Sequence, residues 1–384
     1  MRWLVALGVA LHLGLQVLPA WQKVSRNRTG RDYASYHYAV QVAWRGGDPY
    51  DTDALAAAAK REGTRAAVHP FFYPPPFVLA TSWAKPLSLR DGYRAMFVLN
   101  EALLVGCLVV AWRAFAVSPW AIALLLATFT PTPDNATMGQ ANLLALFPAL
   151  LGLALAPRRP LAGGALVGLA AMLKMSPALF LAYWALRREW KPVAAAVGAA
   201  VVLSLATLPL VGFEAQRRFY LDILPGFSWG DYHGLTVPIG LPANHSIPDL
   251  FDRLWPGPND HHLSDRAHAA SLAVAIAALA VWAWRFRSPG DEPAAIAALT
   301  VLMVVIPVYT YEHHLVFLLV AVAIAATRGP VWPVLVAYFF LAWPLEWLRA
   351  AQKALPADLG PWVRESKFLA EAALFLLLFR RPRG

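Results

Sequence analysis

The stretch VAAAVGAAVVLSLATLPLVG, residues 193–212, decides the fold class, because it is twenty residues long and carries no charge. An α-helix needs about 20 mainly apolar residues to cross the hydrocarbon core of a membrane. Stretches of similar character recur along the whole chain, separated by charged or proline-rich breaks. The chain is 59% hydrophobic and only 15% charged, whereas a soluble domain is about 25% charged. The sequence therefore predicts a polytopic membrane protein of the all-α class.

We expect a bundle of about twelve transmembrane helices in one integral membrane domain, residues 1–384. The first apolar stretch resembles a secretory signal peptide, but it is long and its cleavage pattern is poor, so we expect a retained span. The two stretches on either side of residues 174–177 are short, and we expect broken or tilted helices there. The expected spans are residues 3–21, 92–113, 118–133, 140–156, 161–175, 177–187, 193–212, 268–286, 293–309, 313–327, 331–348 and 366–380.

Basic residues mark every second break between these spans. Cytoplasmic loops of membrane proteins carry an excess of Lys and Arg, so these breaks indicate the cytoplasmic side. The short breaks on the other side are 134–139, 174–176 and 310–312, where only Lys174 is basic. We therefore expect a multi-pass plasma-membrane protein with both termini in the cytoplasm, whose net charge of +10 needs no nucleic-acid partner. The basic residues of the cytoplasmic breaks are Arg2, Arg113, Arg158, Arg159, Arg187, Arg188, Lys191, Arg285, Arg287, Arg328, Arg380, Arg381 and Arg383.

Three longer loops lie on the extracytoplasmic side, and the first is too long to be a simple connection. Aromatic and apolar residues at helical spacing from Tyr33 to Trp44 predict a helix that lies flat on the membrane surface. Residues 46–51 predict a tight turn, and residues 53–61 predict a short alanine-rich helix. The three loops are residues 22–91, 213–267 and 349–365.

Unusual polar residues gather in the breaks and loops of this same side. Ionisable groups at the ends of spans are costly unless they line a wet cavity or serve a function. Their shared side therefore predicts one outward-facing site at the lipid boundary. These residues are Asp32, Asp48, Asp51, Asp134, Asn135, Gln140, Asn142, Lys174, Asn244, His245, Ser246, Glu312, His313 and His314.

Most of these groups also have a purely structural explanation. An aspartate beside a Pro-Tyr turn can cap the turn, and a polar pair after Pro-Thr-Pro can cap the next helix. Amide side chains at a span end can join helices by hydrogen bonds. A lysine can extend to the lipid headgroups, and adjacent histidines can lie at the interface without a task. These alternatives apply in turn to Asp48 and Asp51, to Asp134 and Asn135, to Gln140 and Asn142, to Lys174, and to His313 and His314.

The chain contains one cysteine, Cys107, inside an apolar run. It cannot form an internal disulfide or a cysteine metal site, and we interpret it as a small buried hydrophobic residue. His261 and His262 beside Asp260 are a weak metal signal in a proline-rich loop. The sequence indicates no cofactor, and it leaves a divalent metal open without supporting one.

A series of short motifs runs along the chain between residues 30 and 320. They are Asp32-Tyr33 with Tyr36, Gly46-Gly47-Asp48-Pro49-Tyr50-Asp51, Tyr73-Pro74-Pro75, Gly139-Gln140-Ala141-Asn142, Gly163-Gly164, Lys174 with Pro177, Arg187-Arg188-Glu189-Trp190-Lys191, Asn244-His245-Ser246 and Glu312-His313-His314. Together they resemble glycosyltransferase family 87. No single motif is specific, but their order and their predicted side of the membrane are.

The resemblance implies a membrane glycosyltransferase of the GT-C class. Its donor would be a hexose, with mannose as the family expectation, carried on a polyprenyl phosphate. Its acceptor would be a lipid or a glycan of the cell envelope. Several other GT-C families carry two adjacent acidic residues soon after the first span, whereas here Arg31 precedes the single carboxylate of Asp32.

Within this resemblance we expect Asp32 to be the general base that takes the proton of the acceptor hydroxyl. Inversion is the natural outcome, because retention usually needs a second carboxylate as nucleophile. His313, His314 and Lys174 are the candidates for binding the donor phosphate. The candidates for contacts to sugar or acceptor are Tyr36, His37, Gln140, Asn142 and Asn244.

Two other classes of function fit a polytopic chain. A transporter or a flippase for lipid-linked sugars often has inverted repeats and polar groups deep in the membrane, whereas the polar groups here lie at one face. A scaffold protein would present outer loops whose polar residues point apart. We favour a transferase, because its site requires these residues to converge.

Overall fold

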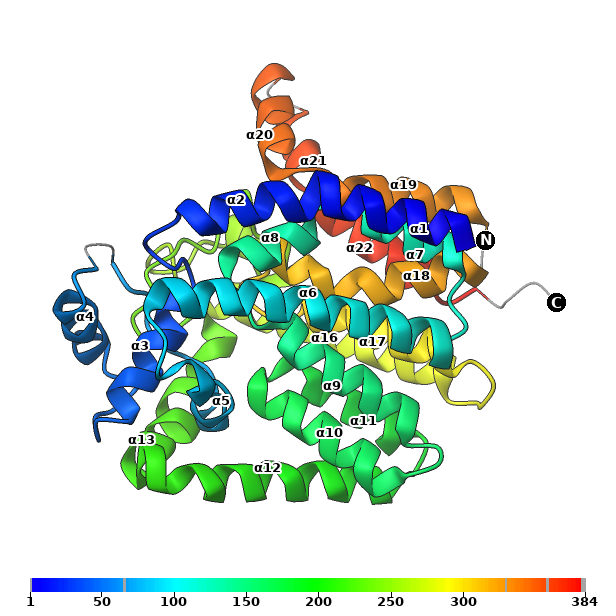
Figure 1. Cartoon of the computed structure of the whole chain (residues 1–384). Coiled ribbons are helices and arrows are strands. Elements are labelled where there is room, and N and C mark those ends of the chain that lie inside the picture. The colour runs from blue at the N-terminus through cyan, green and yellow to red at the C-terminus, as the bar shows by residue number, and fades with distance from the viewer. Residues whose placement is uncertain (1, 65–66, 329, 357–358, 381–384) are drawn as a thin grey trace. The chain divides into compact units, whose positions relative to one another are not determined.

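The structure is a computed structural model that describes residues 2–64, 67–328, 330–356 and 359–380 (Figure 1). Every regular element among these residues is a helix, apart from one isolated bridge between Asn259 and His262. This confirms the expected all-α class. Arg381 and Arg383, which we expected in the cytoplasmic C-terminus, lie outside the described residues.

Four segments among the described residues are long and apolar enough to cross a membrane, or up to six if two bent helix pairs are each counted as one span. Helical breaks at proline or glycine divide other apolar stretches into shorter helices of 10–17 residues. The expected span at 118–133, for example, contains a helix of only ten residues. The prediction of about twelve spans is therefore not confirmed. The four long segments are Trp3–Arg26, Leu89–Ala114, Trp190–Val211 and Asp265–Phe286.

The chain forms two compact units, each assembled from separate segments of sequence. Unit 1 comprises residues 1–18, 108–134 and 238–384, and unit 2 comprises residues 19–107 and 135–237. Three helices cross a boundary between the units: α2 (Leu18–Arg26), of which only Leu18 belongs to unit 1, α6 (Leu89–Ala114) and α8 (Pro131–Met138).

Unit 2 contains the whole of the first outer loop and the helices from α9 to η5 (Figure 1). Within it, α10 packs against both α9 and α12, and α5 packs against α12. Besides part of α6 and α8, its helices are α2 (Leu18–Arg26), α3 (Tyr33–Ala43), α4 (Thr52–Arg61), α5 (Pro75–Ala80), η2 (Ser82–Ala84), α9 (Asn142–Leu155), α10 (Pro160–Leu173), η3 (Ser176–Leu179), α11 (Phe180–Leu186), α12 (Trp190–Val211), α13 (Phe213–Arg218), η4 (Phe219–Ile223), α14 (Leu224–Gly226) and η5 (Phe227–Trp229).

Glycines allow α10 and α12 to approach each other very closely. A Cβ atom on Gly164 would lie 2.2 Å from the carbonyl oxygen of Pro192, and one on Gly168 would lie 2.3 Å from that of Ala196. Small residues at such contacts let helix backbones touch in a membrane, where van der Waals packing drives association. These two contacts fix the register of the two helices near their N-terminal ends.

Unit 1 contains the first helix and the C-terminal third of the chain. Here α17 packs against α18, α22 packs against α17 and α19, and α1 packs against α7. Its helices are α1 (Arg2–Leu11), η1 (His12–Val17), α7 (Pro119–Thr128), α15 (Ile247–Leu254), α16 (Asp265–Phe286), α17 (Glu292–Val305), η6 (Glu312–Phe317), α18 (Leu318–Arg328), α19 (Val331–Ala342), α20 (Leu345–Ala354), α21 (Gly360–Arg364) and α22 (Ser366–Leu377).

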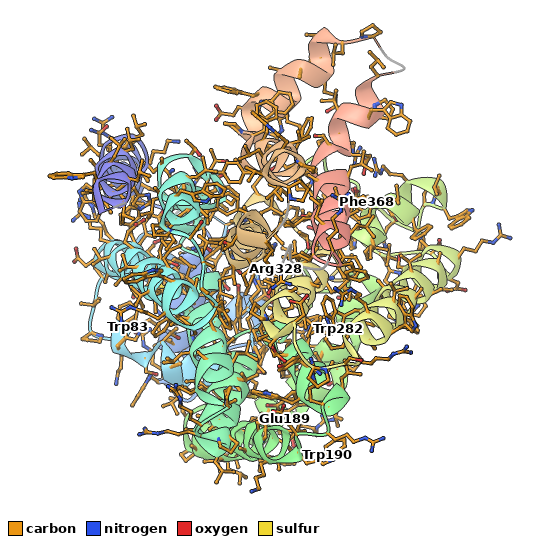
Figure 2. All side chains as sticks on the ribbon, turned by 90° about the vertical axis from the view of Figure 1, so that its right-hand side faces the viewer. Trp83, Glu189, Trp190, Trp282, Arg328 and Phe368 are labelled. Carbon is orange, nitrogen blue, oxygen red and sulfur yellow. The ribbon has the colours of Figure 1, made fainter. Side chains whose placement is uncertain are left out.

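In unit 1 the breaks that share a predicted side of the membrane also lie together. Arg328 (Figure 2) pairs with Asp291 at 2.5 Å, and Arg285 donates to the carbonyl of Phe379 at 2.7 Å, so three expected cytoplasmic breaks meet at one end. Near the same end, the indole of Trp282 donates to the α17 backbone at 2.9 Å (Figure 2). At the other end, the backbone of the 213–267 loop bonds to the 310–312 break through His245.

In unit 2, loops that share a predicted side of the membrane also lie together. Arg218 bonds to Asp48 at 2.5 Å, and His233 donates to the carbonyl of Tyr50 at 2.8 Å, so the first outer loop contacts the 213–267 loop. Each unit therefore brings together the breaks that the charge pattern assigns to one side.

The first outer loop contains the expected turn at 46–51 and the expected helix, α4, whose N-terminus is capped by the side chain of Asp51. The helix expected from Tyr33 to Trp44 is also present, as α3. However, nearly all of its side chains are buried, so it is covered by protein on all sides. It is not the surface-lying amphipathic helix that the aromatic spacing predicted, because other parts of the same loop pack around it.

Candidate active site

Asp32 lies where a strained turn leads into α3. The two preceding residues have positive φ angles, 72° at Gly30 and 49° at Arg31. Few residues other than glycine adopt that region, so surrounding contacts must hold the turn. One such contact is the hydrogen bond from the backbone N–H of Asp32 to the carbonyl of Met138 at 3.1 Å. The side chain of Asp32 does not cap its own helix, and it is therefore available for other partners.

The partner of the Asp32 carboxylate is Gln140, whose Nε2 donates to Oδ2 at 2.6 Å. The Oε1 atom of the same amide lies 3.2 Å from the hydroxyls of both Tyr36 and Tyr73. These hydroxyls lie 2.6 Å from each other. The hydrogens of the two hydroxyls are thus shared among the three contacts between Tyr36, Tyr73 and Oε1 of Gln140. Because Oε1 accepts from the tyrosines, the NH₂ group of Gln140 is oriented toward Asp32.

The loop that carries Gln140 is held tightly in place. Gly139 has a φ of 68°, and a Cβ atom there would lie 2.7 Å from the Cβ of Tyr33. Asn100 of α6 donates to the carbonyls of Met96 and Gln140, at 3.0 and 3.1 Å. Its own oxygen accepts a hydrogen bond from Asn135 at 2.8 Å. These two buried amides join α6 to α8 and hold the backbone of Gln140 in place.

Lys174 and Asn142 form a second polar pair in unit 2. Lys174 follows the last residue of α10, and its Nζ donates to Asn142 Oδ1 at 2.5 Å. The ammonium group also lies 5.9 Å from the centroid of the Tyr73 ring, within the range of a cation–π contact. Asn142 is fully buried at the start of α9. The Tyr73 ring thus connects the Lys174 pair to the Asp32–Gln140 network.

The surroundings change the acidity of Asp32. Burial raises the pKa of this carboxyl above its usual value, because the charged form loses hydration. The hydrogen bond from Gln140 and the positive charges of His69, Arg31 and Lys174 act in the opposite direction but do not cancel the effect of burial. A carboxylate whose pKa is raised toward neutrality is a better general base than an exposed one.

His37 lies on α3 but outside this network. Successive helix residues do not face each other, so His37 points away from its neighbour Tyr36. Its Nε2 lies 3.4 Å from Glu62, and its buried Nδ1 has no hydrogen-bond partner. These neighbours do not place His37 beside Asp32, so its predicted role in binding sugar or acceptor stays a prediction.

Asn244 belongs to unit 1, where its side chain joins two segments of the protein. Both amide hydrogens are used, by the carbonyls of Ile239 at 3.0 Å and Val308 at 2.8 Å. The amide oxygen accepts from the backbone of Thr310 at 2.8 Å. We therefore leave Asn244 out of the proposed sugar contacts.

His313 and His314 also lie in unit 1, with their rings 4.3 Å apart. The Nδ1 atom of His314 accepts a hydrogen bond from the backbone N–H of Tyr311 at 3.0 Å. A neutral imidazole whose Nδ1 is an acceptor carries its hydrogen on Nε2, so Nε2 of His314 is a donor. The prediction that these two residues bind the donor phosphate stays a prediction.

A buried ionic cluster beside these histidines was not foreseen. Glu312 bonds to His245 at 2.9 Å and to the ammonium of Lys367, and Glu371 lies one turn further along α22. Burial alone raises the pKa of Glu312, but its interactions with His245 and with the ammonium of Lys367 outweigh burial and hold the pKa below its usual value. Lys367 is fully buried. A lysine and a glutamate within an apolar stretch were the signal that could have revealed this cluster.

The structure thus brings Asp32, Tyr36, Gln140, Asn142 and Lys174 together in unit 2. It adds Tyr73 and Asn100, whose roles the sequence did not indicate. Among the described residues, no three His, Cys, Asp or Glu side chains are grouped so that they could hold a metal ion.

Comparison with known families identifies one match. A family model for glycosyltransferase family 87 matches residues 71–310, which is well over half of the 384-residue chain. The matched range contains Gln140, Asn142, Lys174 and Asn244. The candidates that lie outside it are Asp32, Tyr36, His37, His313 and His314. No curated protein matches the chain.

Proposed function

The chain belongs to glycosyltransferase family 87, and from this premise we propose that Asp32 is the general base of a membrane glycosyltransferase. The family membership favours transfer over transport as the activity of this polytopic protein. The observation that carries the proposal is the Asp32–Gln140 contact, in which a partly buried carboxylate is oriented by an amide that two tyrosines fix.

Asp32 Oδ2 accepts the hydrogen bond from Gln140, which leaves Oδ1 for the acceptor hydroxyl. This oxygen takes the hydroxyl proton as the acceptor attacks the anomeric carbon of the donor sugar, and the bond from that carbon to the phosphate oxygen breaks. A positioned base of this kind typically contributes about 10²–10⁴-fold to the rate. Because unit 2 contains no second carboxylate bonded to Asp32 among its described contacts, a single displacement with inversion is the simplest course.

Lys174 supplies positive charge to the leaving phosphate. A cation aimed at a developing negative charge lowers the barrier most where water is excluded. Its contact with Asn142 fixes the ammonium beside the Tyr73 ring. Tyr36, Gln140 and Asn142 then provide hydroxyl and amide groups for hydrogen bonds to the sugar.

We propose a hexosyl group, mannosyl by family expectation, carried on a polyprenyl phosphate as the donor, with a lipid or glycan acceptor. The support is chemical, because an apolar chain is retained in the bilayer while its sugar phosphate reaches polar groups at a span end. The positive-inside pattern supports a site on the extracytoplasmic face of the plasma membrane with cytoplasmic termini.

A donor panel tests this proposal. Purified protein in lipid vesicles would be incubated with polyprenyl-phosphate sugars and with the matching nucleotide sugars, together with glycolipid acceptors. We expect transfer from a polyprenyl-phosphate hexose and none from a nucleotide sugar, with inverted anomeric configuration in the product. Transfer from nucleotide sugars at comparable rates would contradict the proposed donor class, and retained configuration would contradict the single displacement.

A further inference from the structure

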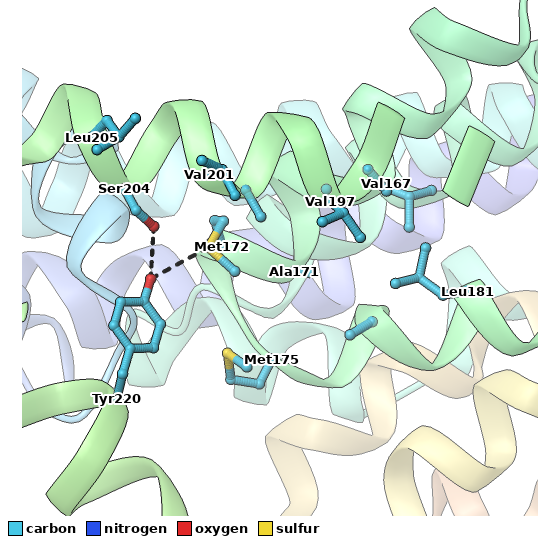
Figure 3. A pocket seen from close by; sticks show the side chains of 14 residues that line it. Val167, Ala171, Met172, Met175, Leu181, Val197, Val201, Ser204, Leu205 and Tyr220 are labelled. Carbon is cyan, nitrogen blue, oxygen red and sulfur yellow. Dashed lines mark hydrogen bonds between the residues drawn. The ribbon is translucent and has the colours of Figure 1, made fainter. Parts of the chain in front are cut away.

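A separate apolar cavity lies in unit 2, on the other side of the break that carries Lys174. It has a volume of about 420 Å³ and is lined by residues of α10, η3, α11, α12 and η4 and by Met175 (Figure 3). Its lining is apolar apart from two hydroxyls, those of Ser204 and Tyr220, which bond to each other at 2.8 Å. The Tyr220 hydroxyl also approaches the sulfur of Met172 at 3.8 Å, across the cavity end that Figure 3 shows.

The cavity is open along α12. Val197, Val201 and Leu205 line it, and each of these side chains is also more than half exposed, at 52, 52 and 58%. A residue that both lines a cavity and is exposed lies at its mouth. α12 is long and apolar enough to cross a membrane. If it spans the bilayer, the exposed mouth faces lipid, and the cavity is a groove that a hydrocarbon chain can enter from the side.

One end of the groove is closed and the other leads toward the polar residues. Gly168 and Ala196 line the groove, and one turn before them Gly164 is in close contact with Pro192, so the backbones of α10 and α12 meet at this end. At the opposite end the lining includes Met172 and Met175. Methionine is flexible and polarisable, so it adapts to chains of irregular shape.

The position of the two methionines connects the groove to the candidate active site. Lys174 lies between them in sequence, and consecutive Cα atoms are only about 3.8 Å apart. Met172 and Met175 face the groove, whereas the Lys174 ammonium bonds to Asn142 and lies over the Tyr73 ring. A ligand with an apolar chain joined directly to an anion would place the chain in the groove and the anion at Lys174.

We propose that this groove binds the phosphate-proximal part of the donor's isoprenoid chain. The inference rests on the proposed donor class and deepens it by giving the chain a place. The isoprenoid is favoured over an acyl chain of the acceptor because it is bonded directly to the phosphate that reacts. The acyl chains of a glycolipid lie beyond its headgroup, far from the attacking hydroxyl.

Photolabelling of the native protein tests the groove without requiring catalysis. The probe is a sugar-free polyprenyl phosphate with a diazirine in its first isoprene units, added to vesicles that contain the full chain. We expect labelled peptides from α10, η3 and α12, protected by unlabelled polyprenyl phosphate and not by a diacyl phospholipid. Label on other helices, or equal protection by phospholipid, would overturn the proposal.

A pair of variants on α12 gives a second, kinetic test. Ala200 lines the groove, whereas Ala206 is exposed on the same helix and does not line it. Ala200→Phe should raise KM for a long-chain donor by about tenfold or more, the effect of losing a few buried methylene groups. It should leave kcat nearly unchanged, and it should leave the KM nearly unchanged for a donor that carries a methyl group in place of the isoprenoid chain. Ala206→Phe should change none of these values.

Equal effects of the two variants, or equal effects of Ala200→Phe on donors with and without the isoprenoid chain, would contradict the groove. The experiments distinguish a failure of the groove assignment from a failure of the proposed general base. A sugar-free polyprenyl phosphate that labels the groove supports the lipid site even if Asp32 proves not to be the base. Conversely, transfer that depends on Asp32 stands even if the label appears elsewhere.

Discussion

Asp32 and Gln140 are separated by 108 residues in sequence, and the hydrogen bond between them is the central contact of the candidate active site. The carboxylate is stabilised in its charged form by the Gln140 amide and destabilised by burial, with burial the larger effect. A general base must be deprotonated before it accepts a proton. The balance between these two effects therefore sets the pH at which transfer begins.

The pH profile follows from this balance. Transfer should fall as pH drops through the Asp32 pKa, which lies above the usual aspartate value of about 3.9. Gln140→Leu removes a hydrogen bond that favours the carboxylate, so the acidic limb of kcat/KM should move to higher pH. Tyr36→Phe leaves the Asp32 contact in place and should leave the midpoint unmoved. An acidic limb that stays in place in Gln140→Leu would show that the limb does not report Asp32.

At the residue scale, the sequence placed Asp32, Gln140, Asn142 and Lys174 on one predicted side of the membrane, and the structure places these four residues in one network of contacts. It could not indicate which polar group each of them would contact. Asn244 also lies at such a break, yet its amide is consumed by backbone partners. Sidedness selects candidates for a site, whereas local packing decides whether a side chain retains free hydrogen-bonding capacity.

At the scale of elements, short helices that meet at polar breaks position most of these groups. The 160–187 region becomes α10, η3 and α11, with Lys174 in the break between them. The sequence indicated this interruption through its short apolar stretches and Pro177. It did not indicate that α3 would be buried on all sides, because aromatic spacing along one helix does not show what packs around it.

The least expected contact of the fold is the ion pair between Lys367, at the start of α22, and Glu312. Removing one partner of a buried pair leaves an uncompensated charge, at a cost of about 3–5 kcal/mol. Lys367→Met should therefore lower the thermal unfolding temperature in detergent markedly, and adding Glu312→Gln should restore much of the loss. Lys353→Met, at an exposed lysine of α20, is the control and should change little. An unchanged unfolding temperature in Lys367→Met would show that the buried pair does not stabilise the protein.

At the scale of the whole molecule, charge asymmetry predicts which breaks share a side of the membrane, and each unit brings together breaks of one predicted side. In unit 1, Arg285, Arg328 and Asp291 gather at one end, while His245 and Glu312 lie at the other. The number of spans was harder to predict, because hydrophobicity does not distinguish a full span from a short apolar helix buried in protein. The helices α7 and α17 are examples of such short helices.

The two units also explain why the sequence suggested a single domain. Each unit is assembled from segments distant in the chain, and three helices continue from one unit into the other. A composition that is apolar from end to end contains no linker that would mark a boundary. Contacts between distant segments, rather than sequence order, therefore define these units.

The most direct measurement of the central claim is sugar transfer by Asp32→Asn in membrane vesicles supplied with a polyprenyl-phosphate hexose. Asn is nearly the same size but cannot accept the proton, so transfer should fall by about 10²–10⁴-fold while expression and unfolding temperature are kept. Asp51→Asn is the matched control, since Asn also caps helices, and it should transfer sugar like the native protein. Near-native transfer by Asp32→Asn would contradict the assignment of Asp32 as the base.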